Sequence, residues 1–260
     1  MKNIFNILVI TLAMAIAFSI YLFYFGDPNN FEDPATKTKP KQGNIVGMIY
    51  TGGPIVGVLI GLIIIVITFT FERYFSINKA KGKGNTAVYL KKVLEHLQKG
   101  DYDEALRECE QQRGSLANIM RAAIERFKTI EYDENYPTEK KLAEVQRAID
   151  EATNLETPLL EKNLVILSTV ASISTLFGLL GTTIGMIRAF AAFGETGTVD
   201  ATQLAIGISE ALYNTAGGLF GAIIGIVSYN FFTTKVDDYV YMIDEAILGV
   251  TQIFTIRTKK

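Results

Sequence analysis

The sequence predicts an all-α integral membrane protein with four transmembrane helices, and three observations carry this prediction. Hydrophobic residues make up 49% of the 260 residues and the mean hydropathy is +0.24, which is too apolar for an ordinary soluble protein. Charged residues are unevenly spread, with fifteen Lys/Arg and sixteen Asp/Glu between Phe71 and Leu160. Four apolar stretches reach the roughly 20 residues that a helix needs to cross the hydrocarbon core, namely Ile4–Phe25, Ile45–Phe69, Leu164–Ile187 and Thr202–Phe232.

These stretches divide the chain into five regions. Residues 1–43 are expected to form an anchor span and a periplasmic loop, 44–70 the second span, 71–160 a cytoplasmic helical domain, 161–234 two paired spans, and 235–260 a cytoplasmic C-terminal helix.

The composition excludes several classes of function. A formal net charge of −2 leaves no basic excess to follow a phosphate backbone, so no nucleic-acid partner is expected. One cysteine excludes an internal disulfide framework, and one histidine excludes the usual metal cages. Cys109 and His96 lie in a charged, helix-like stretch, and we expect a structural role for both at the surface or half-buried. No nucleophile–base pair, Walker loop or metal-ligand spacing indicates an enzyme, so no catalytic residue, cofactor or metal is expected.

The first span has two interpretations. Lys2 precedes it, and Ala13, Ala15 and Ala17 offer small residues for cleavage, as in a signal peptide. The apolar run nevertheless continues to Phe25, which is longer than a typical signal-peptide core. We therefore expect a retained anchor at the periphery of the assembly, because its apolar residues cover all faces.

The placement of Lys and Arg predicts the orientation. Basic residues follow the second and fourth spans and precede the third, which places these ends, and both termini, in the cytoplasm. The turn Gly194–Ala201 carries only acidic charges and is expected outside. Basic residues in the first loop argue against this orientation, and nearby acidic residues partly offset them. The residues concerned are Arg73, Lys79, Lys81, Lys83, Lys162, Lys235, Arg257, Lys259 and Lys260 inside, and Lys37, Lys39 and Lys41 in the first loop.

The charged region, residues 71–160, is predicted to be helical. Gly100 and Asp101 indicate a helix stop and an N-cap for a helix over Tyr102–Gln112, and Gly114 with Ser115 repeats the arrangement for Leu116–Lys128. A loop over Tyr132–Pro137 precedes a helix that begins near Thr138, and Pro158 is expected to kink that helix near the membrane surface. Its apolar stripe is predicted at Leu142, Val145, Ile149, Leu155, Leu159 and Leu160.

The third and fourth spans each carry small and polar residues at helical spacing, opposite a face of large apolar residues. Small residues let helix backbones approach closely in a bilayer, so most of these glycines are expected to pack helices. The third span shows Ser168, Ser172, Thr175, Gly178, Thr182, Gly185 and Arg188. The fourth shows Gly207, Glu210, Asn214, Gly217, Gly221, Gly225 and Ser228, and Gly181 joins the packing set.

Glu210 is the residue that helix packing does not explain. It is the only acidic residue inside the four predicted spans, and an ionisable group there is costly and by default a functional hypothesis. Thr182 and Thr183 on one helix and Asn214 and Thr215 on the other lie within about two turns of its level, at 1.5 Å per residue. A carboxyl among hydroxyls suits a proton relay. The alternative is a protonated carboxyl that only hydrogen-bonds a neighbouring helix.

Two runs resemble the ExbB/TolQ branch of the MotA/TolQ/ExbB proton-channel family. Phe177–Ile187 reads FGLLGTTIGMI, and Ile208–Leu219 reads ISEALYNTAGGL and is followed by Tyr229-Asn230. The resemblance is strong over Glu156–Phe232 and weaker over Gly100–Phe127, while Met1–Gly43 lies outside it.

The resemblance implies an inner-membrane motor subunit that forms a homopentamer around the helices of a single-span ExbD/TolR-type partner. In that family a membrane glutamate and two threonines line the proton path, and they fall on Glu210, Thr182 and Thr215. Thr183, Asn214, Ser209 and Arg188 are expected as supporting pore-lining residues. Proton flow would drive a TonB-type protein in the ExbB case, with membrane lipids as further partners.

Three alternatives stay open. A TolQ-like subunit would share the channel core. A MotA-like flagellar stator also has four spans, but its key carboxylate is on the partner chain, which Glu210 argues against. A non-conducting scaffold would use the glycines for packing alone. Among transported ions, H⁺ is favoured over Na⁺ because several acidic ligands are lacking at that depth.

Overall fold

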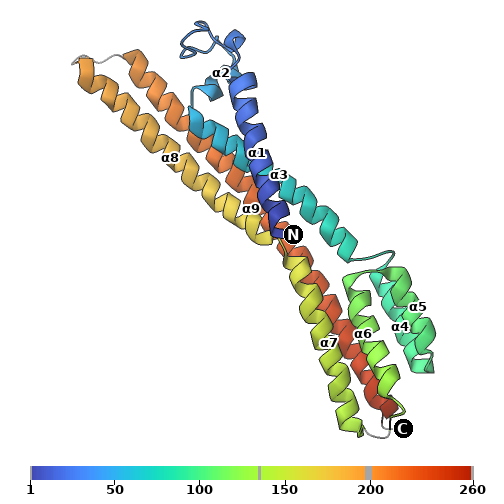
Figure 1. Cartoon of the computed structure of the whole chain (residues 1–260). Coiled ribbons are helices and arrows are strands. Elements are labelled where there is room, and N and C mark those ends of the chain that lie inside the picture. The colour runs from blue at the N-terminus through green and yellow to red at the C-terminus, as the bar shows by residue number, and fades with distance from the viewer. Residues whose placement is uncertain (1, 134–135, 197–200, 259–260) are drawn as a thin grey trace. The chain divides into compact units, whose positions relative to one another are not determined.

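The structure is a computed structural model that describes residues 2–133, 136–196 and 201–258 (Figure 1). Two compact units divide the chain. The first, here the apolar unit, comprises Met1–Phe71 and Val165–Asn230, and the second, here the charged unit, comprises Glu72–Leu164 and Phe231–Lys260. The described residues form helices and one isolated β-bridge between Phe31 and Pro40.

The helices confirm the all-α prediction. They are α1 (Lys2–Ser19), η1 (Ile20–Phe25), η2 (Pro28–Asn30), α2 (Ile45–Tyr50), α3 (Pro54–Ala80), α4 (Thr86–Lys99), α5 (Tyr102–Gln112), α6 (Ser115–Ile130), α7 (Thr138–Glu161), α8 (Leu164–Thr196) and α9 (Ala201–Thr258). Four segments are long and apolar enough to cross a membrane, as predicted: Asn6–Phe25, Pro54–Ala80, Thr138–Ala191 and Leu204–Thr258. The predicted turn Gly194–Ala201 lies largely outside the described residues.

In the apolar unit, glycines bring α8 and α9 into backbone contact. A Cβ added to Gly178 would lie 3.1 Å from Gly218 Cα, and one added to Gly185 would lie 2.9 Å from Ala211 N. The backbones of α8 and α9 therefore lie close together at these glycines. The packed face of α8 differs from the predicted stripe, because Ser172 and Thr175 are exposed. The buried residues of that face are Ala171, Ser174, Gly178, Gly181, Gly185 and Ala189.

The α1 helix lies against α3. The ring of Phe18 lies 3.0 Å from the position that a Cβ on Gly57 would take, and Met14 approaches Gly61 in the same way. Ile4, Leu8 and Leu12 are more than half exposed. An outward face of this kind fits a helix at the edge of the unit.

The structure divides the second predicted span. The apolar stretch from Ile45 is interrupted after α2 by a turn at Thr51–Gly53, and α3 begins at Pro54. Gly53 has φ +76°, a conformation that side-chain-bearing residues adopt at a cost of about 1 kcal/mol. Pro54 has no backbone N–H to donate and is favoured in the first turn of a helix. Hydrophobicity alone does not reveal this break.

In the charged unit, α4–α7 and the end of α9 pack around a common core. Phe127 of α6 stacks on Phe254 of α9 with ring centroids 4.0 Å apart, and both rings are fully buried. The fourth predicted span and the separate C-terminal helix form one 58-residue helix, α9, because no proline interrupts the sequence between them.

The predicted helix Tyr102–Gln112 is confirmed. Gly100 takes the left-handed conformation, and Asp101 accepts a hydrogen bond from Glu104 N. The second cap is wrong, because Gly114 rather than Ser115 caps α6 after Arg113 takes the left-handed conformation.

Two further expectations are corrected. Cys109 is buried, not half-exposed, and its Sγ lies 3.1 Å from Tyr89 Oη. Leu155 is 72% exposed and is not part of the apolar stripe. Pro158 lies inside α7, which ends at Glu161, before Asn163 with φ +64°, and the kink expected at Pro158 stays a prediction.

Candidate functional site

Glu210 of α9 forms an ion pair inside the apolar unit. Its Oε1 accepts a hydrogen bond from Arg188 Nη1 of α8 at 2.5 Å. The Glu210 side chain is 8% exposed, whereas the Arg188 side chain is 55% exposed. The close packing of α8 on α9 therefore places the buried carboxylate of Glu210 beside the guanidinium of Arg188, whose side chain is more exposed.

The turn between α2 and α3 forms one wall of this ion pair. A Cβ on Gly53 would lie 2.9 Å from Glu210 Oε1 and 3.4 Å from Arg188 Nη1. The space beside the carboxylate therefore admits glycine alone without displacement of the pair, and the positive φ of Gly53 selects the same residue.

Asn214 lies one helical turn from Glu210 on the same face of α9. It is fully buried, and its Nδ2 donates to Gly52 O at 2.9 Å. A Cβ on Gly181 would meet Asn214 Cβ at 2.2 Å, so α8 also holds the amide in place. Asn214 Oδ1 and the neighbouring Thr215 Oγ1 are buried and have no hydrogen-bond partner among the residues that the structure describes. Unpaired buried acceptors of this kind require an explanation.

A pair of stacked tyrosines joins η1 to α2 in the apolar unit. The rings of Tyr21 and Tyr50 stack with centroids 4.8 Å apart, and Tyr21 Oη is 3.4 Å from Tyr50 O. Tyr21 also interacts electrostatically with both Glu210 and Arg188. The N-terminal segment therefore contributes to the surroundings of the carboxylate.

The structure brings together only some of the predicted site residues. Arg188 and Asn214 lie beside or next to Glu210, whereas the hydroxyls of Thr182 and Thr183 donate to Leu179 O and Leu180 O of their own helix. These two threonines point to backbone of α8 in this structure. Their role as proton-path residues stays a prediction.

Ser209 lines a separate cavity of about 400 Å³ within the apolar unit. Tyr213 of α9 and Lys39 of the first loop also line it, together with Glu32, Thr38 and Met48. The cavity therefore lies between the first loop and α9, on residues adjacent in sequence to Glu210 and Asn214.

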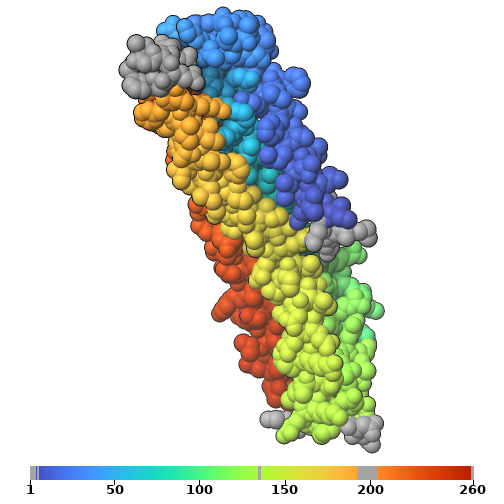
Figure 2. Space-filling model, turned by 60° about the vertical axis from the view of Figure 1, so that its left-hand side comes forward, coloured from blue at the N-terminus to red at the C-terminus, as the bar shows by residue number. Residues whose placement is uncertain are grey.

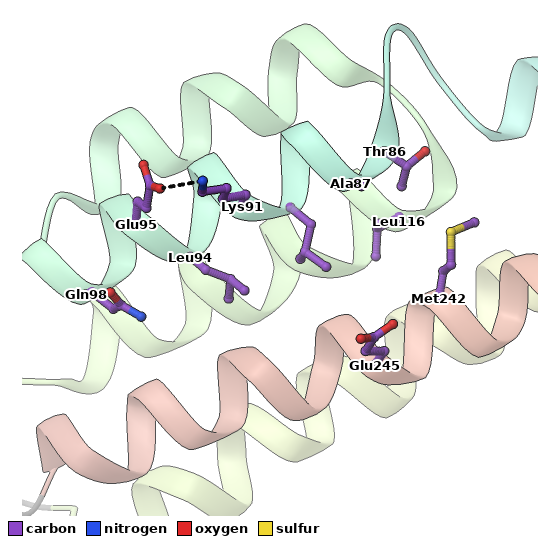
Figure 3. Close-up of a pocket in the computed structure, with 10 residues that line it drawn as sticks. Thr86, Ala87, Lys91, Leu94, Glu95, Gln98, Leu116, Met242 and Glu245 are labelled. Atoms are coloured by element: carbon purple, nitrogen blue, oxygen red, sulfur yellow. Dashed lines mark ion pairs between the residues drawn. The ribbon is translucent and has the colours of Figure 1, made fainter.

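The charged unit carries an open groove of about 510 Å³ between α4, α6 and α9 (Figure 3). Leu94 and Leu116 contribute an apolar lining, and Lys91 pairs with Glu95 at 4.0 Å on its rim. In the described part of the chain, no group of three or more His, Cys, Asp or Glu is placed to hold a metal.

The sequence patterns do not predict the turn at Gly52–Gly53 or the stacking of Tyr21 on Tyr50. The available signal was the dipeptide Gly-Gly before Pro54, which is typical of a turn even inside an apolar run.

Comparison with known proteins places this site within a family. Residues 110–245, which include Arg188, Glu210 and Asn214, match the MotA/TolQ/ExbB proton channel family. The chain belongs to this family. The match confirms the resemblance seen in the sequence, and with the four apolar helices it makes the chain a multi-pass membrane protein. The family's description as proton channels also agrees with the expectation that the chain is not an enzyme.

The curated relatives include proteins named TolQ and proteins named ExbB. The chain is 41% identical over 103 residues to the Tol-Pal system protein TolQ of Haemophilus influenzae, covering 38% of this chain and 45% of that protein. It is 43% identical over 77 residues to the biopolymer transport protein ExbB of Aquifex aeolicus, covering 30% and 52%. A putative ExbB homolog of Methanothermobacter thermautotrophicus is 28% identical over 202 residues, covering 78% and 67%. The chain spans about half the length of the TolQ relatives it matches.

Proposed function

We propose that the chain is a proton-conducting motor subunit of the ExbB type, in which Glu210 takes up and releases the transported proton. The observation that carries this proposal is a buried carboxylate on the packed face of two glycine-rich helices, in a chain of a proton-channel family. Moving one charge through a membrane potential supplies about 2.3 kcal/mol per 100 mV. A carrier must change protonation to use this energy, which a carboxyl can do and a threonine hydroxyl cannot.

In this proposal Thr182 and Thr215 support proton transfer as relay hydroxyls. Thr215 Oγ1 is buried, has no partner among the described residues, and is available to hydrogen-bond a transferred proton or a water molecule. Thr182 would have to rotate away from Leu179 O to take part.

The functional unit is proposed to be a homopentamer in the inner membrane, with both termini in the cytoplasm and a retained N-terminal anchor. Large apolar residues stay exposed along α8 and α9, and α8 is open along the face shown in Figure 2. Such surfaces suit contact with lipid or with further helices. The exposed residues include Leu176, Leu179, Leu212, Phe220 and Ile223.

A single-span ExbD/TolR-type protein is the proposed partner within the oligomer, and a TonB-type protein at the outer membrane the proposed target. A TolQ-like role in the Tol-Pal system is the second candidate, because the TolQ protein of Haemophilus influenzae is 41% identical to the chain over 103 residues. The neighbouring genes distinguish the two candidates.

The test is proton flux in vesicles that contain the chain and the single-span protein that co-purifies with it. Glu210→Gln preserves the size of the side chain and its capacity to hydrogen-bond but removes its titration. Flux should fall to the level of empty vesicles while the oligomer and the partner are retained. A non-conducting scaffold would instead give the same proton flux for the wild-type chain and for Glu210→Gln. Near-normal flux in the variant would overturn the assignment of Glu210 as the proton carrier.

A further inference from the structure

Glu210 requires different neighbours when it is ionised and when it is protonated. A carboxylate that is 8% exposed lacks the water that would otherwise stabilise its charge, so it needs a cation or several donors. Arg188 supplies that cation at 2.5 Å. Because the Arg188 side chain is itself 55% exposed, its guanidinium can move away from the pair without becoming buried alone.

A protonated Glu210 has the opposite requirement. It carries an O–H donor, and a buried donor without an acceptor is destabilising. Arg188 offers donors only, so it cannot accept this hydrogen bond. Asn214 Oδ1, one turn away on the same helix face, is buried and has no partner in the described part of the chain, while Asn214 Nδ2 is fixed on Gly52 O.

Resting on the function proposed above, we infer that Glu210 exchanges partners as it is protonated, with Arg188 as its counter-ion when ionised and Asn214 Oδ1 as its acceptor when protonated. A proton from the outer side forms the carboxyl O–H bond, the ion pair with Arg188 breaks, and the O–H donates to Asn214 Oδ1. Loss of the proton toward the inner side breaks the O–H bond and restores the ion pair. One proton moves for each exchange.

Arg188 is therefore a positioning residue that sets the outside pH at which Glu210 is loaded. From the other packed elements, Tyr21 interacts with both members of the pair, and the turn at Gly52–Gly53 contributes backbone. Arg188 is the charged group that interacts with Glu210 among the described residues.

Measurement of proton flux against outside pH tests the role of Arg188. In Arg188→Gln the carboxylate loses its counter-ion and binds a proton more readily, so the half-maximal pH should move upward by about one unit or more. Arg188→Lys retains the positive charge but not the planar guanidinium with its paired donors, and should move the half-maximal pH less than half as far. Arg121→Gln removes an exposed arginine from the charged unit and should leave the profile unchanged.

Asn214→Leu tests the acceptor. It keeps the side-chain volume but removes Oδ1, together with the Nδ2 that donates to Gly52 O. The protonated carboxyl then loses its acceptor, so flux should fall about tenfold and the half-maximal pH should move downward, opposite to the shift expected for Arg188→Gln. Flux equal to that of the wild-type protein would overturn the role of Asn214.

Other outcomes separate this inference from the function on which it rests. If Glu210→Gln abolishes flux but Arg188→Gln gives a wild-type pH profile, the partner exchange is wrong and the proton carrier stands. If Glu210→Gln conducts normally, the proposed function itself is wrong. If Arg188→Gln fails to assemble, the double variant Arg188→Gln/Glu210→Gln should assemble, because no unpaired charge remains. Failure of the double variant to recover would overturn the counter-ion role.

Discussion

Gly53 provides a sharp test of how closely the α2–α3 turn confines the ion pair. Gly53→Ala introduces two penalties. The first is the positive φ of +76°, which costs an alanine about 1 kcal/mol. The second is a Cβ 2.9 Å from Glu210 Oε1 and 3.4 Å from Arg188 Nη1, a separation at which the carboxylate or the turn must shift.

Gly43 offers a matched control in the same unit. It has φ +80°, and a Cβ added there meets no atom within 4 Å. Gly43→Ala should therefore carry only the backbone penalty of about 1 kcal/mol, whereas Gly53→Ala should cost at least about 1 kcal/mol more, a typical overpacking effect.

Thermal unfolding in detergent and proton flux in vesicles measure the difference. We expect Gly53→Ala to melt below Gly43→Ala and to lose flux about tenfold, because a displacement of the pair by a few tenths of an ångström or more weakens its contact. Equal melting temperatures and equal flux for the two variants would refute the claim that this turn positions Glu210.

Three further predictions concern other parts of the chain. Burial raises the pKa of the Cys109 thiol to about 11. At pH 8 the thiolate is therefore scarce, and a maleimide should label Cys109 only after denaturation. Rapid labelling of the folded protein would contradict the burial of Cys109. Phe254→Ala should lower the free energy of unfolding of the charged unit by about 3–5 kcal/mol, because Phe254 is fully buried on Phe127. Ile256→Ala, at a 61% exposed position, should change this free energy by less than about 1 kcal/mol. Denaturant titrations measure both values. Thr182→Ser should retain most proton flux and Thr182→Val should lose most of it, and equal flux for the two would remove the hydroxyl from the proton path.

Much of the architecture follows from sequence patterns that depend on local chemistry. Apolar runs near the length of a bilayer crossing identify four spans, and a glycine stop followed by Asp101 identifies α5 with its bounds. The solitary acidic residue in the apolar spans identifies Glu210. Each of these signals acts within a few turns of one helix.

The missed features depend on contacts between segments distant in sequence. Arg188 was expected as general pore-lining support, but its pairing with Glu210 depends on the register between α8 and α9. The turn at Gly53 was hidden inside an apolar run, and its importance comes from a carboxylate more than 150 residues later. The packed face of α8 was misjudged at Ser172 and Thr175, because small polar residues suit both a helix interface and an exposed position.

The most direct test of the central claim is an infrared difference spectrum of the reconstituted complex as the outside pH is lowered. We expect a protonated-carboxyl band to appear on acidification in the wild-type protein, to be absent in Glu210→Gln, and to appear at higher pH in Arg188→Gln. A carboxyl band of the same size and pH dependence in Glu210→Gln and the wild-type protein would contradict the assignment of Glu210 as the proton carrier.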